Sequence, residues 1–177
     1  YFAVPAAGAI LVSLNTRLSA GEQRDILAHS ESVLLLHDST HTERAAELRG
    51  GPCGGTLLVT EAIAPSGIRA FTPTPAGADE PAQLYYTSGT TGAPKGVVLT
   101  HRNVCTHALA AVQELSMHRT DRWAHIAPMF HLADAWATFA FTWGGARHVL
   151  TPRFDALATL RTISAERVTI TNLIPAM

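Results

Sequence analysis

The sequence predicts the α/β fold class, with a largely parallel sheet and flanking helices. Short apolar runs alternate along the whole chain with longer segments of helical periodicity. Strands separated by helices of about ten residues need crossover connections, and such connections place the strands parallel to one another. No segment repeats at a fixed period, so the pattern does not indicate a repeat protein.

The first third of the chain shows this alternation clearly. Ser19 is followed three residues later by Glu22, and this capping box predicts the start of a helix. Residues 33–37 form an uninterrupted apolar run, which is typical of a strand buried on both faces. In chain order, the expected elements are a strand at 10–14, a helix from 19 to about 29, a strand at 33–37, a helix at 42–49 and a strand at 56–60.

The composition then changes and the alternation resumes. Residues 64–82 contain four prolines and two glycines, which indicates a loop or linker. Further on, Thr100 is a suitable N-cap for the next helix. The expected elements are strands at 83–87, 96–100, 123–126, 147–150 and 168–172, and helices at 101–115, 131–142 and 155–164.

These elements predict three parts in the chain. Residues 1–63 form a first α/β segment, residues 64–82 a linker loop, and residues 83–177 a second α/β segment. Tyr1 is not a methionine, the chain begins inside an apolar pattern, and the pattern stops just after the last strand. We therefore expect both ends to be truncated and the chain to be a piece of a longer protein.

Composition narrows the functional classes. The formal net charge is −1, with 47% hydrophobic and 15% charged residues, so no field attracts the protein to nucleic acid. The apolar start is interrupted by Pro5, Gly8 and Asn15 and is too short for a stable membrane span. Cys53 and Cys105 lie far apart and are predicted to be reduced thiols, which favours a cytoplasmic protein. No histidine has HExxH spacing, so we predict no metal site made of protein side chains.

Residues 86–96, YTSGTTGAPKG, are the most polar and flexible stretch between apolar runs. Gly89 and Gly92 let successive backbone N–H groups turn toward one point and form an anion-binding nest. Lys95, the sole lysine of the sequence, adds a mobile positive charge. A mobile hairpin loop is the alternative, which the preceding apolar strand, Pro94 and the sole lysine disfavour. The candidate phosphate-binding residues are Thr87, Ser88, Gly89, Thr90, Thr91, Gly92 and Lys95.

Three common motifs do not fit this stretch. Walker A, GxxxxGK[ST], requires a glycine where the chain has Pro94, and the Rossmann GxGxxG requires one at Thr91. The nucleophile elbow GxSxG requires a glycine at Tyr86. The sequence therefore disfavours a P-loop kinase or ATPase and a hydrolase with Ser88 as its nucleophile.

A different signature matches the stretch residue for residue. Residues 86–97, YTSGTTGAPKGV, followed by THRN at 100–103, resemble the phosphate loop [YF]TSG[ST]TGxPKGV and the THxN helix start of the adenylate-forming superfamily. Residues 7–38 are similar to the family's early segment, with its Asn-x-Arg turn, and APMFH at 127–131 resembles its Pro-Leu-[FY]-His motif. The resemblance is to acyl-CoA synthetases of the fatty-acid–CoA ligase type. It implies part of the N-terminal domain of an adenylate-forming enzyme.

The resemblance also implies a reaction. A carboxylate attacks the α-phosphorus of ATP and releases pyrophosphate, and the thiol of coenzyme A then displaces AMP. ATP, Mg²⁺ and coenzyme A are the implied co-substrates and cofactors, and a fatty or aryl acid is the implied substrate. The resemblance assigns catalytic roles to Lys95 and His131, and it places Phe130 with His131 at the acid. The family's later nucleotide motifs and its catalytic C-terminal lysine do not occur before Met177. We therefore expect the isolated chain to be inactive and to self-associate through exposed surface.

The surroundings of Asp134 and the class of protein both stay open at this point. Asp134 follows the PMFH motif, where a carboxylate is costly unless it is paired or faces solvent. Trp136, Phe139 and Phe141 are expected in the core rather than in a specificity pocket. The alternatives to a CoA ligase are a non-catalytic nucleotide- or phosphate-binding or structural fragment, and an adenylation domain of the peptide-synthetase or luciferase type.

Overall fold

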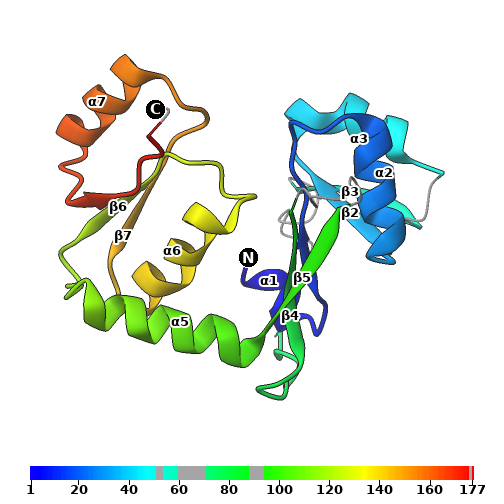
Figure 1. The fold of residues 1–177 in the computed structure, drawn as a ribbon, viewed down its shortest axis with the longest axis horizontal. Helices are drawn as coiled ribbons and strands as arrows, with labels where there is room; N and C mark the ends of the chain where they lie inside the picture. Colours follow the sequence, from blue (N-terminus) through cyan, green and yellow to red (C-terminus); the bar gives the residue numbers. More distant parts are fainter. Residues whose placement is uncertain (51–53, 60–70, 88–93, 176) are drawn as a thin grey trace.

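The computed structural model describes residues 1–50, 54–59, 71–87, 94–175 and 177 (Figure 1). The strands are β1 (Leu11–Ser13), β2 (Leu34–His37), β3 (Gly55–Leu58), β4 (Pro81–Thr87), β5 (Lys95–Thr100), β6 (Arg122–His125), β7 (Arg147–Leu150) and β8 (Ile170–Thr171). The helices are α1 (Ala3–Ala6), α2 (Ala20–His29), α3 (Thr42–Leu48), α5 (His101–Glu114), α6 (Leu132–Trp143) and α7 (Ala156–Ala165), with a 3-10 turn η1 (Ser39–His41) before α3. The expected strands and helices are therefore present, with ends shifted by a few residues.

The described strands form three small sheets, with the orders β1-β4-β5, β2-β3 and β7-β6-β8. All pairs are parallel except β4 and β5, which are antiparallel. The reason is the length of the connection, because residues 88–94 are too few for the crossover that a parallel pair needs. The α/β class with largely parallel strands is confirmed, although the described strands form three sheets instead of one. β1 and β4, from the first and third predicted segments, pair in the same sheet.

The predicted capping box at Ser19 is present, and the predicted N-cap Thr100 forms a second capping box. The Ser19 hydroxyl accepts a hydrogen bond from the backbone N–H of Glu22, whose carboxylate accepts one from the backbone N–H of Ser19 at 2.8 Å. At the start of α5, Thr100 and Asn103 make the same reciprocal pair, with distances of 3.0 and 3.2 Å. These bonds satisfy N–H groups that the first helical turn leaves free. The second box also links the end of β5 directly to α5.

One expectation about burial is wrong. The apolar run at 33–37 does form β2, but its side chains are not buried on both faces, since Val33 is 78% exposed and Leu34 and Leu36 are also exposed. Among the described residues β2 pairs only with β3. Leu35 packs toward Leu27 of α2 and Leu48 of α3, so helices cover one face of the strand.

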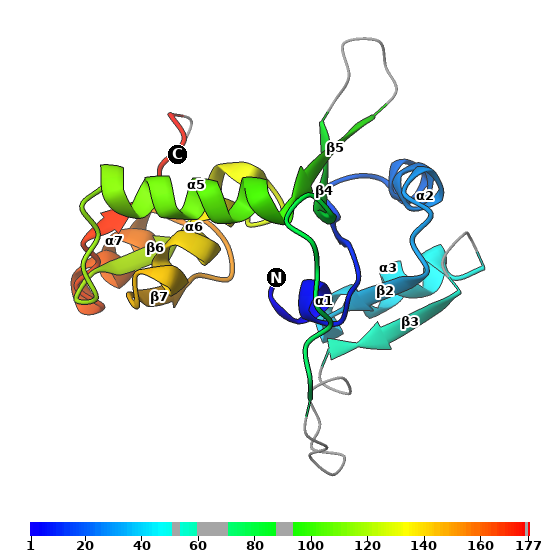
Figure 2. The same ribbon diagram turned by 90° about the horizontal axis from the view of Figure 1, so that it is seen from below.

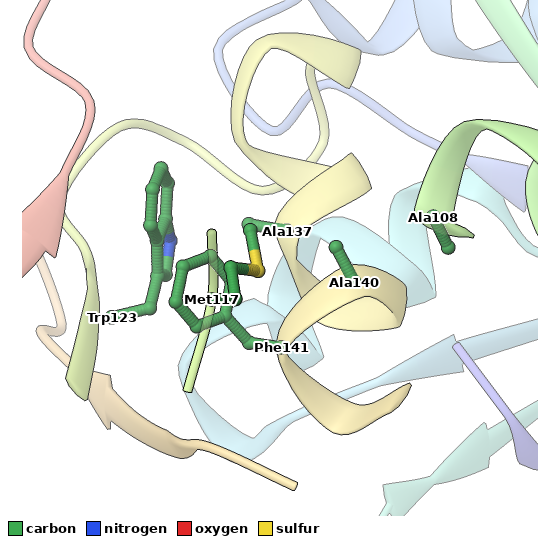
Figure 3. Close-up of a cluster of buried hydrophobic side chains, with 6 residues drawn as sticks. All are labelled: Ala108, Met117, Trp123, Ala137, Ala140 and Phe141. Carbon is green, nitrogen blue, oxygen red and sulfur yellow. The ribbon is translucent and has the colours of Figure 1, made fainter. Parts of the chain in front are cut away.

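The largest core lies between α5, α6 and β6. Trp123 and Phe141 are fully buried with ring centroids 4.7 Å apart, and small alanine side chains from α5 and α6 complete the cluster (Figure 3). The small alanine side chains let α5 and α6 approach closely. The two aromatic rings fill the space between α6 and the sheet. α5 runs from the β4–β5 hairpin to this second part of the molecule (Figure 2). No helix in the described part of the chain is long and apolar enough to cross a membrane.

Candidate functional site

The predicted phosphate loop connects β4 to β5. Thr87 and Lys95 are direct cross-strand partners at the loop end of this hairpin, and both are exposed. The antiparallel ladder thus brings a hydroxyl and the sole lysine of the sequence to the two ends of the loop. Ser88, Gly89, Thr90, Thr91 and Gly92 lie outside the described residues.

The base of the loop is tied to the rest of the fold through Tyr86. Its phenol oxygen lies 2.7 Å from Nδ1 of His29 at the end of α2, and the two rings meet edge to face. Gly96 is the cross-strand partner of Tyr86. A Cβ atom at Gly96 would lie 3.3 Å from Cζ of the Tyr86 ring and 3.2 Å from the side chain of Leu84. The glycine after Lys95 therefore leaves room for Tyr86 to reach α2.

The second part of the candidate site is the turn before α6. His131 is the N-cap residue of α6, and its ring centroid lies 4.6 Å from that of Phe130. The guanidinium carbon of Arg17 lies 5.8 Å from the centroid of the Phe130 ring, within cation–π range. Burial lowers the pKa of His131, and the positive charge of Arg17 lowers this pKa further. The arrangement favours a neutral imidazole at His131.

Arg17 is a site residue that the sequence reasoning did not assign. Its backbone N–H donates to the Asn15 side chain at 2.9 Å, which confirms a turn at the Asn-x-Arg segment. The resemblance included this turn, but nothing in the sequence indicates that it lies against Phe130, more than a hundred residues away.

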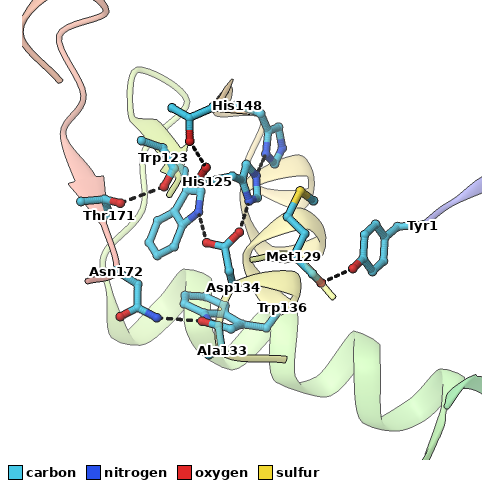
Figure 4. Close-up of polar contacts among 12 residues, drawn as sticks. Tyr1, Trp123, His125, Met129, Ala133, Asp134, Trp136, His148, Thr171 and Asn172 are labelled. Atoms are coloured by element: carbon cyan, nitrogen blue, oxygen red, sulfur yellow. Dashed lines mark hydrogen bonds and ion pairs between the residues drawn. The ribbon is translucent and has the colours of Figure 1, made fainter. Parts of the chain in front are cut away.

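The backbone around His131 is held from several sides. The Tyr1 hydroxyl donates to the carbonyl oxygen of Met129. The carbonyl oxygen of Ala133 accepts from Asn172 Nδ2 at 2.8 Å and from the Trp136 indole at 3.0 Å (Figure 4). Contacts from both ends of the described chain therefore converge on the turn.

The structure answers the question about Asp134. Its side chain is 0% exposed, and its carboxylate accepts from the Trp123 indole at 3.2 Å and contacts His125 Nδ1 at 2.6 Å (Figure 4). Its place in the first turn of α6 adds the favourable field of a helix N-terminus. The carboxylate is therefore buried but paired.

A cavity of about 630 Å³ begins next to the His131 turn. β4, β5, α5 and α6 line it, largely with apolar side chains, among them Leu99, Val104, Leu132, Trp136 and Phe139. Trp136 and Phe139 also pack against the core cluster, as expected. They therefore form part of the core and part of the cavity wall, whereas Phe141 is fully buried.

The whole chain matches one protein family. The family described as AMP-binding enzyme matches residues 1–177, and the chain belongs to this family. It is 36% identical to a long-chain-fatty-acid–CoA ligase of Thermus thermophilus, over 99% of this chain and 35% of that protein. It is 34% identical to a 2-succinylbenzoate–CoA ligase of Bacillus licheniformis, over 96% of this chain and 35% of the relative. The resemblance inferred from the motifs is confirmed.

Solved structures agree with this assignment. The inhibitor-bound N-terminal domain of FACL13 from Mycobacterium tuberculosis has a TM-score of 0.87 at 30% identity, over 96% of this chain and 44% of that one. The o-succinylbenzoate–CoA synthetase of Bacillus subtilis in complex with ATP and magnesium has a TM-score of 0.83 at 32% identity, over 96% and 35%. The fold is that of the N-terminal region of adenylate-forming enzymes. The chain spans about 35% of the length of the curated relatives described above.

Proposed function

We propose that this chain is part of an AMP-forming acid–CoA ligase that activates a fatty or aryl acid. The carboxylate of the acid attacks the α-phosphorus of ATP to give an acyl-adenylate and pyrophosphate, and coenzyme A then displaces AMP to give the thioester. The main support is the similarity to CoA ligases along the entire chain, motif 86–96 included.

Lys95 and Thr87 are proposed to hold the phosphates that leave as pyrophosphate. Both are exposed at the loop end of the β4–β5 hairpin, where an anion can reach them. A lysine ammonium is a compact charge that follows a phosphate as its charge changes. Ser88, Gly89, Thr90, Thr91 and Gly92 are proposed to complete the phosphate site with hydroxyl and backbone N–H donors.

His131 and Phe130 are proposed to border the carboxylate end of the acid. The lowered pKa of His131 favours a neutral ring, which can donate or accept a hydrogen bond without adding charge beside Arg17. The apolar cavity that begins at Leu132 suits the hydrocarbon or aromatic part of the acid. This cavity supports a fatty or aryl acid over a small polar one.

The implied cofactors fit the described residues unequally. The exposed lysine and threonine fit the phosphates of ATP. For Mg²⁺, the described ranges contain no group of three or more His, Cys, Asp or Glu side chains that could hold a metal ion. We therefore assign no Mg²⁺ ligand among the described residues. We propose coenzyme A as the thiol substrate, from the names of the relatives. A cytoplasmic location is proposed on the same basis.

The direct test is acid-dependent exchange of pyrophosphate into ATP by the intact protein that contains this chain. A panel of fatty and aryl acids is assayed, and coenzyme A thioesters are sought by mass spectrometry. Exchange and thioester formation with at least one acid are expected. Exchange without any thioester would favour a peptide-synthetase or luciferase type of enzyme, and ATP binding by calorimetry without exchange would favour a non-catalytic module.

The isolated 177-residue chain is the matched comparison. We expect it to show no exchange, and robust exchange would contradict the proposal that it is an inactive fragment. Its exposed apolar side chains on β2 and β5, among them Leu34, Leu36, Val97 and Val98, also support the proposal that it self-associates. Light scattering across concentrations checks this, since a purely monomeric species would contradict it.

A further inference from the structure

A chain of hydrogen bonds leads from the buried Asp134, next to the His131 turn, to the surface at Thr142 near the C-terminal end of α6. The buried carboxylate of Asp134 contacts His125 Nδ1 at 2.6 Å, and His125 Nε2 lies 2.9 Å from His148 Nδ1 (Figure 4). His148 Nε2 lies 3.0 Å from the exposed hydroxyl of Thr142. The imidazole rings of His125 and His148 are stacked, with only 12° between their planes. Nothing in the proposed chemistry uses these side chains directly.

The donors and acceptors allow more than one proton arrangement in this chain. An indole N–H can only donate, so Asp134 Oδ1 accepts from Trp123. When Asp134 is a carboxylate, its Oδ2 also accepts, and the contact with His125 then requires a proton on His125 Nδ1. If His125 is neutral, its Nε2 accepts from His148 Nδ1–H, and His148 Nε2 accepts from Thr142. If His125 carries a second proton on Nε2, it donates to His148 Nδ1, and His148 Nε2–H donates to Thr142. Every nitrogen is partnered in both of these arrangements, which differ by one proton and by the tautomer of His148. The added proton could instead make His148 doubly protonated beside a neutral His125, but burial lowers the pKa of His148 and disfavours that form.

Asp134 connects this chain to the candidate acid site. Its backbone N–H donates to the carbonyl oxygen of His131 at 3.2 Å, within the first turn of α6. The side chain ties that turn to β6 through Trp123 and His125. The turn that carries His131 is therefore joined to a carboxylate whose partners lie on β6.

We propose that Asp134, His125 and His148 form one proton-sharing unit that positions the His131 turn, so that binding of the acid responds to the uptake of one proton by the unit. His131 keeps its place at the acid, and the three residues act through it as positioning residues. The inference rests on the proposed function only for the role of His131. The protonated form strengthens the contact between Asp134 and His125, because a charged donor then meets the carboxylate.

The charges around the unit limit it to a single added proton. Among the described residues, the titratable groups that face it are Asp134 on α6, His125 on β6, His148 on β7 and the Tyr1 phenol from the N-terminal segment. Burial lowers the pKa of His148, the neighbouring His125 lowers it further, and Asp134 partly offsets this. A second positive charge on the stacked rings is therefore disfavoured.

Two substitutions separate the positioning role from a general loss of structure. In Asp134→Asn the amide oxygen still accepts from Trp123, and the amide N–H can donate to His125 Nδ1. The contacts remain, but His125 and His148 are then both held as Nε2–H tautomers and the carboxylate charge is lost. Asp134→Ala removes the contacts altogether.

The first measurement needs no enzyme activity. Long-range ¹H–¹⁵N spectra of the intact protein, labelled with ¹⁵N-histidine, are followed from about pH 8 to 5, where imidazoles titrate. We expect His148 to change from the Nδ1–H to the Nε2–H tautomer when the unit takes up its proton, and we expect no such change in Asp134→Asn. The His131 signals should shift in Asp134→Ala and stay near their wild-type positions in Asp134→Asn. Independent titration of His125 and His148, or unchanged His131 signals in Asp134→Ala, would overturn the proposal.

The second measurement is the KM of the acid in pyrophosphate exchange over the same pH range. Asp134→Ala should raise this KM about tenfold or more, because a buried charge-assisted anchor is lost. The ratio of the Asp134→Asn KM to the wild-type KM should rise severalfold as the pH falls, since only the wild type gains the protonated form. A ratio independent of pH would overturn the coupling. If no acid supports exchange, the proposed function fails, while the tautomer measurement still decides whether the proton-sharing unit exists.

Discussion

The β4–β5 hairpin and the connection from β6 to α6 each carry one part of the candidate site, but they hold their residues in different ways. Thr87 and Lys95 lie exposed at the end of a two-stranded ladder. His131 instead follows a strand whose Trp123 is buried in the largest core and precedes a turn held by the buried Asp134. The first arrangement leaves a positive charge exposed to solvent, whereas the second places a ring beside a tightly packed core.

The two parts of the candidate site require different properties of the fold. A phosphate site needs donors and a positive charge near solvent, and a flexible lysine can adjust to its ligand. A ring that borders a carboxylate must be held within narrow limits, because a displacement of about 1 Å is costly in catalysis. His131 therefore lies in a tightly packed part of the fold, whereas the role of Lys95 depends mainly on the residues next to it in the sequence.

The largest expected effect comes from weakening the packing between α6 and β6. Phe141→Ala removes a fully buried ring that packs against Trp123, so the free energy of unfolding should fall by about 3–5 kcal/mol. Urea unfolding followed by tryptophan fluorescence measures the change. Val98→Ala on the exposed face of β5 is the control and should change it by no more than about 0.5 kcal/mol. Equal effects of the two substitutions would show that the two parts do not differ in packing.

The next largest effect concerns the exposed end of the β4–β5 hairpin. Lys95→Ala should lower kcat/KM for acid-dependent pyrophosphate exchange about 100-fold, or about 3 kcal/mol of transition-state stabilisation. The unfolding midpoint should not change, because the side chain is exposed. Lys95→Arg keeps the charge in a different geometry and should retain part of the activity. An unchanged kcat/KM in Lys95→Ala would remove this residue from the mechanism.

The smallest effect concerns the cation beside His131. Arg17→Ala should raise the pKa of His131 toward its ordinary value of about 6.5, because one of the two causes of the lowered pKa is lost while burial remains. NMR titration of the His131 ring measures this shift, with Arg17→Lys as the control that keeps the charge.

The lowered pKa also has a consequence for stability. Because His131 has a lower pKa in the folded state, the stability it contributes is complete above the unfolded value and decreases as the pH falls toward the folded one. Arg17→Ala should reduce this loss. An identical His131 pKa in the variant and the wild type would show that the guanidinium does not act on the ring.

Several features of the site were predictable from the chain alone. The motif at 86–96 and the PMFH motif identified the family, and the caps at Ser19 and Thr100 located two helix starts to within a residue. The partners of Asp134 were not predictable, since His125 and His148 become its neighbours only when β6, β7 and α6 pack together. The exposed side of β2 could not be predicted either, because an apolar run does not show how many of its faces the fold covers.

The sequence by itself determined the strand and helix order, the helix caps and the family, and it supplied the residues that are proposed to bind phosphate. These features depend on short-range periodicity, on hydrogen bonds between residues a few positions apart and on residue type. The tertiary structure decided that Thr87 faces Lys95, that Arg17 lies over Phe130 and that Asp134 is buried but paired. Such contacts join residues separated by eight to more than a hundred positions. They form only when packing of the core offsets the entropy of bringing distant segments together.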